Sequence, residues 1–99
     1  MNISYSILTH NETDALEDLL EFLGANKKEQ DEIVVLDDYS SDKTLGILTE
    51  YKEKYGIIWK QRALNKNFGE QKNYLTSLCS GDFIFNLDAD ERPPKFLFE

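Results

Sequence analysis

Short apolar runs alternate with segments of helical periodicity along the whole chain, and this order is the strongest constraint on its fold. The strand-like runs lie at 2–8, 33–36, 57–59 and 83–87, and the helix-like segments lie at 15–23, 42–55 and 70–79. A regular strand–helix alternation favours a parallel sheet with right-handed crossovers. We therefore predict an α/β domain, with a Rossmann-like parallel sheet of about four strands and three flanking helices.

Local signals refine these elements. Asn11 or Thr13 is expected to cap the first helix, and Gly24 to end it. Gly56 and Gly81 follow the second and third helices in the same way. The run that starts at Phe83 is almost wholly apolar, which predicts a strand buried in the sheet.

Composition excludes several classes of partner. The chain has 99 residues, enough for one domain, and a net charge of -8, which argues against binding to nucleic acid or to an anionic membrane. The single cysteine, Cys79, forms no internal disulfide and is expected to be a small buried side chain near a helix end. This favours a reducing compartment, the cytoplasm. The sequence shows neither a signal peptide nor a transmembrane segment.

Polar residues follow three of the four predicted strands. They occupy 9–12 after the first strand, 37–42 after the second and 88–91 after the fourth. Ligands of open parallel sheets bind outside the carboxyl ends of the strands. We therefore expect one ligand site rather than three solvated loops, although Asp and Ser also build turns, and Ser41 or Asp42 can cap a helix. His10, the only histidine, is expected to be a loop residue rather than a catalytic base.

The acidic segment after the fourth predicted strand has the spacing of a metal site. Asp88 and Asp90 are one residue apart, so period-two geometry sends both carboxylates to the same side. Oxygen ligands suit Mg²⁺ or Mn²⁺. The alternative is a solvated acidic loop. Positive charge for a phosphorylated ligand is offered by Arg62, Lys66 and Lys72.

Three segments resemble family 2 glycosyltransferases of the GT-A fold. Residues 34–44, with paired Asp37 and Asp38, resemble the family's V-V-D-D-G-S segment. Residues 67–74 resemble its helix start, and 80–91 resemble its L-D-A-D-E strand, which carries the DxD motif. The sequences of these last two segments are similar to those of the lipopolysaccharide core glucosyltransferase-like branch of the family. Tyr39 departs from the family, which usually has Gly or Asn there.

The resemblance implies a site for a nucleotide-diphosphate sugar, a UDP-sugar in particular. Thr9, Asn11 and Glu12 would line the base pocket, and Asp38, or Asp37 beside it, would accept a hydrogen bond from the uracil N3–H.

The remaining matched residues would serve the ribose and the diphosphate. Lys72 stands where the family commonly has Arg. Asp88 would face the ribose and the metal, and Asp90 would bind the Mg²⁺ or Mn²⁺.

The resemblance also implies an inverting transfer of the sugar to an acceptor hydroxyl, which needs a general base. In the family that base lies well after the DxD strand, so none is assigned here. Residues 1–99 would form the nucleotide-sugar-binding half of a GT-A domain, with its C-terminal half absent and little activity alone.

Other functions remain open at this point. A haloacid-dehalogenase-like phosphotransferase has Thr or Val where this chain has Arg92, and its D-x-D follows the first strand. A response-regulator receiver has its acidic pair after the first strand, where this chain has the sequence Thr-His-Asn-Glu at 9–12. A more serious alternative is a non-catalytic nucleotide-binding fragment, or one that self-associates into a homo-oligomer through its apolar residues 96–98.

Overall fold

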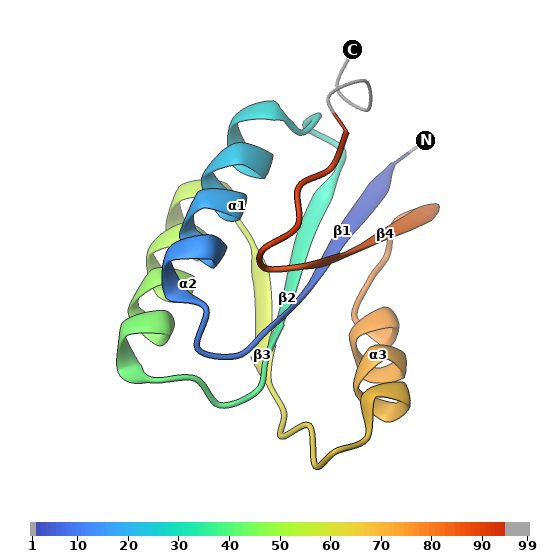
Figure 1. The fold of residues 1–99 in the computed structure, drawn as a ribbon. Coiled ribbons are helices and arrows are strands. Elements are labelled where there is room, and N and C mark those ends of the chain that lie inside the picture. The colour runs from blue at the N-terminus through green and yellow to red at the C-terminus, as the bar shows by residue number, and fades with distance from the viewer. Residues whose placement is uncertain (1, 95–99) are drawn as a thin grey trace.

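The computed structural model describes residues 2–94 and contains one four-stranded parallel sheet, in the order β3-β2-β1-β4 (Figure 1). The elements are β1 (Ile3–Thr9), α1 (Thr13–Asn26), β2 (Glu32–Asp37), α2 (Asp42–Tyr55), β3 (Ile58–Gln61), α3 (Phe68–Ser77) and β4 (Phe83–Asp88). The predicted α/β class and the order of the elements are confirmed.

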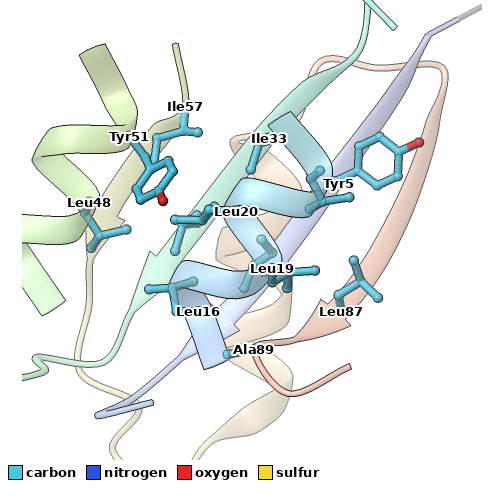
Figure 2. Close-up of a cluster of buried hydrophobic side chains, with 13 residues drawn as sticks. Tyr5, Leu16, Leu19, Leu20, Ile33, Leu48, Tyr51, Ile57, Leu87 and Ala89 are labelled. Carbon is cyan, nitrogen blue, oxygen red and sulfur yellow. The ribbon is translucent and has the colours of Figure 1, made fainter. Parts of the chain in front are cut away.

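The sheet is covered by α1 and α2 on one face and by α3 on the other (Figure 1). The leucine stripe of α1 is fully buried in the larger core, against Tyr5, Ile33 and Leu48 (Figure 2). A buried leucine side chain stabilises the fold by about 2 kcal/mol. On the opposite face, Leu75 of α3 packs with Val34 and Leu36. Both layers leave the carboxyl edge of the sheet open.

The start and the end of the first helix differ from the prediction. Glu12 occupies the N-cap position and its side chain makes no capping bond. Thr13 Oγ1 instead lies 2.8 Å from Thr44 Oγ1. The helix continues past Gly24 to Asn26. A Cβ at Gly24 would lie 2.2 Å from Cδ2 of Tyr55, so this glycine allows α2 to approach α1 closely.

The prediction that the last strand is buried is wrong. β4 is an edge strand that pairs only with β1 within residues 2–94, and Phe83 keeps 54% of its surface exposed. The role predicted for Gly81 also changes, because α3 already ends at Ser77. Gly81 lies against β1, where its N–H donates to Ser4 Oγ at 2.8 Å. Gly56 does end α2, with φ of 68°.

Three further predictions concern the periphery. Cys79 is partly buried beside the Leu75 cluster, and this burial raises the pKa of its thiol. Within residues 2–94, no helix has the length and apolar character needed to cross a membrane. The apolar segment 96–98 lies outside the described residues, and so does its predicted self-association.

Candidate functional site

A pocket of about 250 Å³ opens at the carboxyl edge of the sheet, where the sequence predicted a ligand site. It is lined by Leu8, Thr9, His10, Glu12, Leu36, Asp38, Leu64, Phe68, Gln71, Lys72 and Asp88. These residues come from the ends of β1, β2 and β4, from the loop after β3 and from the start of α3. Five of the predicted site residues therefore meet here: Thr9, Glu12, Asp38, Lys72 and Asp88.

Thr9 lies at the end of β1 and borders this pocket. Its residue is only 4% exposed, and its Oγ1 has no hydrogen-bond partner within residues 2–94. Side chains alternate along a strand, so the Thr9 hydroxyl lies on the face of Tyr5 and Ile7 in the larger core, opposite Leu8.

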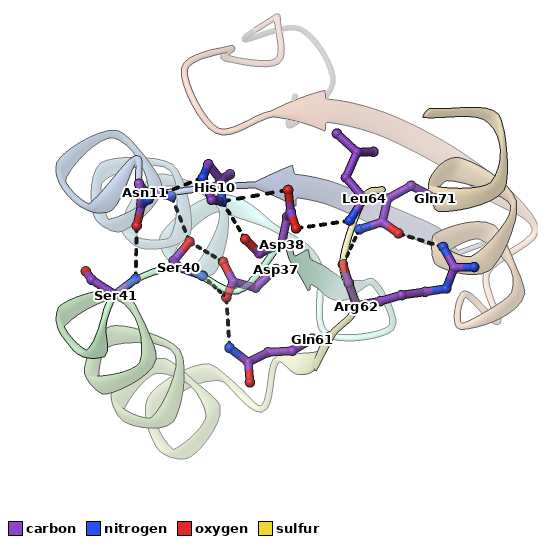
Figure 3. Close-up of polar contacts among 10 residues, drawn as sticks. All are labelled: His10, Asn11, Asp37, Asp38, Ser40, Ser41, Gln61, Arg62, Leu64 and Gln71. Carbon is purple, nitrogen blue, oxygen red and sulfur yellow. Dashed lines mark hydrogen bonds and ion pairs between the residues drawn. The ribbon is translucent and has the colours of Figure 1, made fainter. Parts of the chain in front are cut away.

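Asp37 lies behind the pocket and does not line it. The residue is fully buried, and its carboxylate accepts hydrogen bonds from Ser40 N at 2.9 Å, Ser40 Oγ at 2.5 Å and Gln61 Nε2 at 3.1 Å (Figure 3). These bonds hold the turn after β2 against β3. Asp37 therefore builds the loop that presents Asp38.

Asp38 and His10 face each other across the ends of β2 and β1 (Figure 3). The Asp38 carboxylate accepts from Leu64 N at 3.0 Å and lies 3.8 Å from His10 Nδ1. His10 Nδ1 donates to the Asp38 carbonyl oxygen, and its Nε2 accepts from Asn11 Nδ2 at 3.3 Å. Both ring nitrogens of His10 are thus engaged within the loops.

Asn11 joins the loops after β1 and β2 rather than lining the pocket. Its backbone N–H donates to Ser40 Oγ at 2.7 Å, and its Oδ1 accepts from Ser41 N at 2.9 Å (Figure 3). Asn11 has φ of 50° and Tyr39 has φ of 43°, so both turns use left-handed backbone. The positive φ at Tyr39 explains why Gly or Asn suits this position better.

The acidic residues after β4 lie around a buried alanine. Ala89 is fully buried in the larger core, while Asp88 and Asp90 on either side of it are exposed. Burial of the Glu12 carboxyl group, and then repulsion from Asp90 and Asp88, raises the pKa of Glu12. The three carboxylates therefore share one region of the edge. Among residues 2–94, however, no three His, Cys, Asp or Glu side chains form a metal-binding group by themselves.

The start of α3 supplies three side chains to the pocket, and of these only Lys72 was predicted from the sequence. Phe68 is 64% exposed and Gln71 only 1% exposed, and both line the pocket with Lys72. Positions 68, 71 and 72 lie on one helix face, so helical spacing was the signal that could have found them. The helix starts early because Asn67 Oδ1 accepts from Glu70 N at 3.0 Å.

Arg62 is held away from the role proposed for it. Its Nη1 donates to Gln71 Oε1 at 2.8 Å, its Nη2 lies 3.6 Å from Glu70 Oε2, and its guanidinium lies over the Tyr74 ring. Lys72 makes no ion pair within residues 2–94. Of these two cations, Lys72 is the one positioned for a ligand.

Known proteins resemble this chain over nearly its full length. The poly(ribitol-phosphate) beta-glucosyltransferase of Bacillus spizizenii is 33% identical over 92% of this chain and 15% of its own length. The undecaprenyl-phosphate 4-deoxy-4-formamido-L-arabinose transferase of Klebsiella pneumoniae is 36% identical over 94% of this chain and 30% of its own. The chain therefore spans less than a third of these relatives.

The fold matches the solved structure of TarS 1-349 of S. aureus in complex with UDP-GlcNAc. The TM-score is 0.80 and the identity 28%, and the match covers 91% of this chain and 27% of the TarS 1-349 chain. The four-stranded sheet and its three helices thus have the Rossmann-like fold of the N-terminal part of a GT-A domain. The model of the family described as glycosyl transferase family 2 matches residues 4–99, so this chain belongs to that family.

Proposed function

We propose that the pocket at the carboxyl edge binds the nucleotide-diphosphate sugar, a UDP-sugar, that donates the sugar in a glycosyl transfer. The observation that carries this proposal is a pocket at the carboxyl edge of the sheet in which Glu12, Asp38, Lys72 and Asp88 meet. The complexes of TarS with UDP and with UDP-GlcNAc support the same ligand class.

The uracil base of the nucleotide is assigned to the β1 and β2 side of the pocket. Asp38 accepts from the uracil N3–H, because its carboxylate borders the pocket while that of Asp37 is fully buried in its own turn. Thr9 borders the same part of the pocket at the end of β1. Asn11 acts by holding the two loops together, through its bonds to Ser40 and Ser41.

The ribose and diphosphate are assigned to the β4 and α3 side. Lys72 approaches the phosphate oxygens and Asp88 faces the ribose. Asp88 and Asp90 fit Mg²⁺ or Mn²⁺ shared with the diphosphate, since Mg²⁺ is commonly bound by one or two carboxylates together with substrate phosphates. Burial of Glu12, and then repulsion from Asp90 and Asp88, raises its pKa, and a cation held by these aspartates would relieve the repulsion. A bound cation would neutralise the charge that develops on the departing diphosphate.

Transfer also needs a general base that takes a proton from the acceptor hydroxyl. Both nitrogens of His10 are engaged in the loops, and we assign no catalytic base among residues 2–94. The lipopolysaccharide core glucosyltransferase-like branch and a cytoplasmic location, favoured by the lone Cys79, remain parts of this proposal.

A non-catalytic nucleotide-binding fragment is the second candidate. It is favoured by the span of the chain, which covers only 15% and 30% of the two relatives described above. Both candidates bind UDP, and only the transferase releases UDP from a UDP-sugar in the presence of an acceptor. Detection of released UDP therefore separates them.

Thermal unfolding with UDP tests the donor site. A ligand at a hundred times its Kd stabilises the folded state by about 2.7 kcal/mol, or roughly 10 °C or more for a domain of this size. We expect this rise with UDP and Mn²⁺ together, and its loss in Asp90→Ala. Asp18→Ala, which removes an exposed carboxylate from α1, is the matched control and should keep the rise. Absence of a rise at saturating UDP and Mn²⁺ would contradict the proposal.

A further inference from the structure

A second, smaller pocket adjoins the proposed nucleotide pocket on the α3 face of the sheet. It encloses about 100 Å³ between β1, β4 and α3. Leu8, Lys72 and Asp88 line both pockets, so the two lie side by side around these side chains. A substituent of a ligand in the first pocket would reach the second by passing these shared side chains. We call the smaller one the Asn86 pocket.

Asn86 of β4 presents an oriented amide to this pocket. Ser6 is fully buried, and its hydroxyl donates to Asn86 Oδ1. This bond fixes the carboxamide with its oxygen toward β1. Asn86 Nδ2 makes no hydrogen bond to another of residues 2–94, so a donor remains available in the pocket that Lys72 also lines.

Acceptors and apolar surface complete the lining. Glu91 Oε1 accepts from Asp88 N at 2.7 Å, which holds this carboxylate at the rim beside that of Asp88. Leu8 and Leu75 form an apolar wall. The lining thus combines hydrogen-bond donors, acceptors and an apolar surface within one small volume.

The size of the pocket restricts its occupant. A single water takes about 30 Å³, whereas an apolar cavity of about 150 Å³ holds a benzene molecule. A volume of about 100 Å³ thus suits a group of about four heavy atoms. An acetamido group has that size, with a carbonyl oxygen for Asn86 and Lys72, an N–H for a carboxylate and a methyl for the leucines. A lone hydroxyl would leave the apolar wall uncovered.

We propose that the Asn86 pocket receives the acylamino substituent of the donor sugar, and that Asn86 makes the chain prefer an N-acetylated sugar to a plain hexose. This inference rests on the proposed donor site, because the substituent reaches the Asn86 pocket only from a nucleotide in the larger one. It adds the sugar class, for which the larger pocket offers no contact of its own.

The test measures the binding of three ligands to the unsubstituted chain and to two variants by calorimetry. Asn86→Asp keeps the size of the side chain and the acceptor for Ser6, but replaces the amide donor with a carboxylate oxygen. Asn73→Asp, at an exposed position of α3 outside both pockets, makes the same change in charge. The Kd of each protein is measured for UDP, UDP-glucose and UDP-N-acetylglucosamine, with Mn²⁺ present.

We expect the unsubstituted chain to bind UDP-N-acetylglucosamine about tenfold more tightly than UDP-glucose. A tenfold difference in Kd corresponds to the free energy of about one well-placed hydrogen bond. Asn86→Asp should abolish that preference, while Asn73→Asp should keep it. Equal affinity for the two sugars in the unsubstituted chain, or a preference that survives Asn86→Asp, would overturn the inference while UDP binding still stands. If the unsubstituted chain does not bind UDP at all, the proposed donor site itself is overturned.

Discussion

The ends of β2 and β4 carry the same kind of residue and use it differently. Asp37, at the end of β2, is fully buried and accepts three hydrogen bonds. Asp88 and Asp90, at the end of β4, are exposed, and their carboxylates accept no recorded hydrogen bond within residues 2–94. A carboxylate buried in a hydrogen-bonded turn builds the fold, whereas one left in solvent is available to a ligand.

The position of the two strands in the sheet accounts for this difference. β2 pairs with strands on both sides, so its end is enclosed by the loops after β1 and β3. β4 pairs only with β1 among the described strands, and its end is anchored mainly by the buried Ala89. Burying a charge requires partners, and only the centre of the sheet supplies them.

Asp37→Ala should have the largest effect on stability. It leaves Ser40 N and Gln61 Nε2 without their buried acceptor, which we expect to cost on the order of 3 kcal/mol. For a domain of this size that lowers Tm by roughly 15 °C. Thermal unfolding followed by circular dichroism measures it. An unchanged Tm would show that the two strand ends do not differ as described.

Asp88→Ala should weaken ligand binding and leave the stability of the fold almost unchanged. Removal of an exposed carboxylate is expected to change the free energy of unfolding by no more than about 0.5 kcal/mol. The affinity for UDP with Mn²⁺ should fall at least about tenfold, because a ligand of the cation and of the ribose is lost. Calorimetric titration measures the affinity. If UDP binding is kept and Tm collapses, the assignment of the β4 end to the ligand is wrong.

Tyr39→Gly should stabilise the β2 loop. A tyrosine at φ of 43° is strained, and Tyr39 is 61% exposed, so little packing is lost with its side chain. We expect about 1 kcal/mol of stabilisation, a rise in Tm of about 5 °C. Tyr39→Ala retains the Cβ and therefore the strain, and should give no such rise. Equal gains in both variants would mean that the ring, not the backbone, is responsible.

Glu21 offers the smallest effect, at a carboxylate that is partly exposed and yet has hydrogen-bond partners. Bonds from Lys54 Nζ, Tyr51 OH and Tyr55 OH lower the pKa of Glu21 to about 2. A lowered folded-state pKa contributes stability above the unfolded-state value near 4.5, and this is lost as pH falls toward 2. The urea midpoint of Glu21→Gln should therefore lie below that of the unsubstituted chain at pH 6 and converge with it at pH 2. A difference that does not depend on pH would exclude the charge as its cause.

The element order and the location of the site could be predicted from the sequence, because alternating periodicity and polar strand ends are local signals. The exposure of β4 could not, since no local pattern tells which strand lies at the edge of a sheet. Gly24 was read as a helix end because its contact with Tyr55 is distant in sequence. The division of labour between Asp37 and Asp38 likewise depends on Ser40, Gln61 and Leu64 in three dimensions.

Paramagnetic broadening by Mn²⁺ in the amide spectrum of the ¹⁵N-labelled chain tests the central claim most directly. With UDP present, we expect sub-stoichiometric Mn²⁺ to broaden first the amide signals of 88–90, of 9–12 and of Lys72, and to do so far less without UDP. Broadening centred elsewhere, such as on the exposed acids Glu50 and Glu53 of α2, or broadening that UDP does not enhance, would contradict a shared nucleotide and metal site at the end of β4.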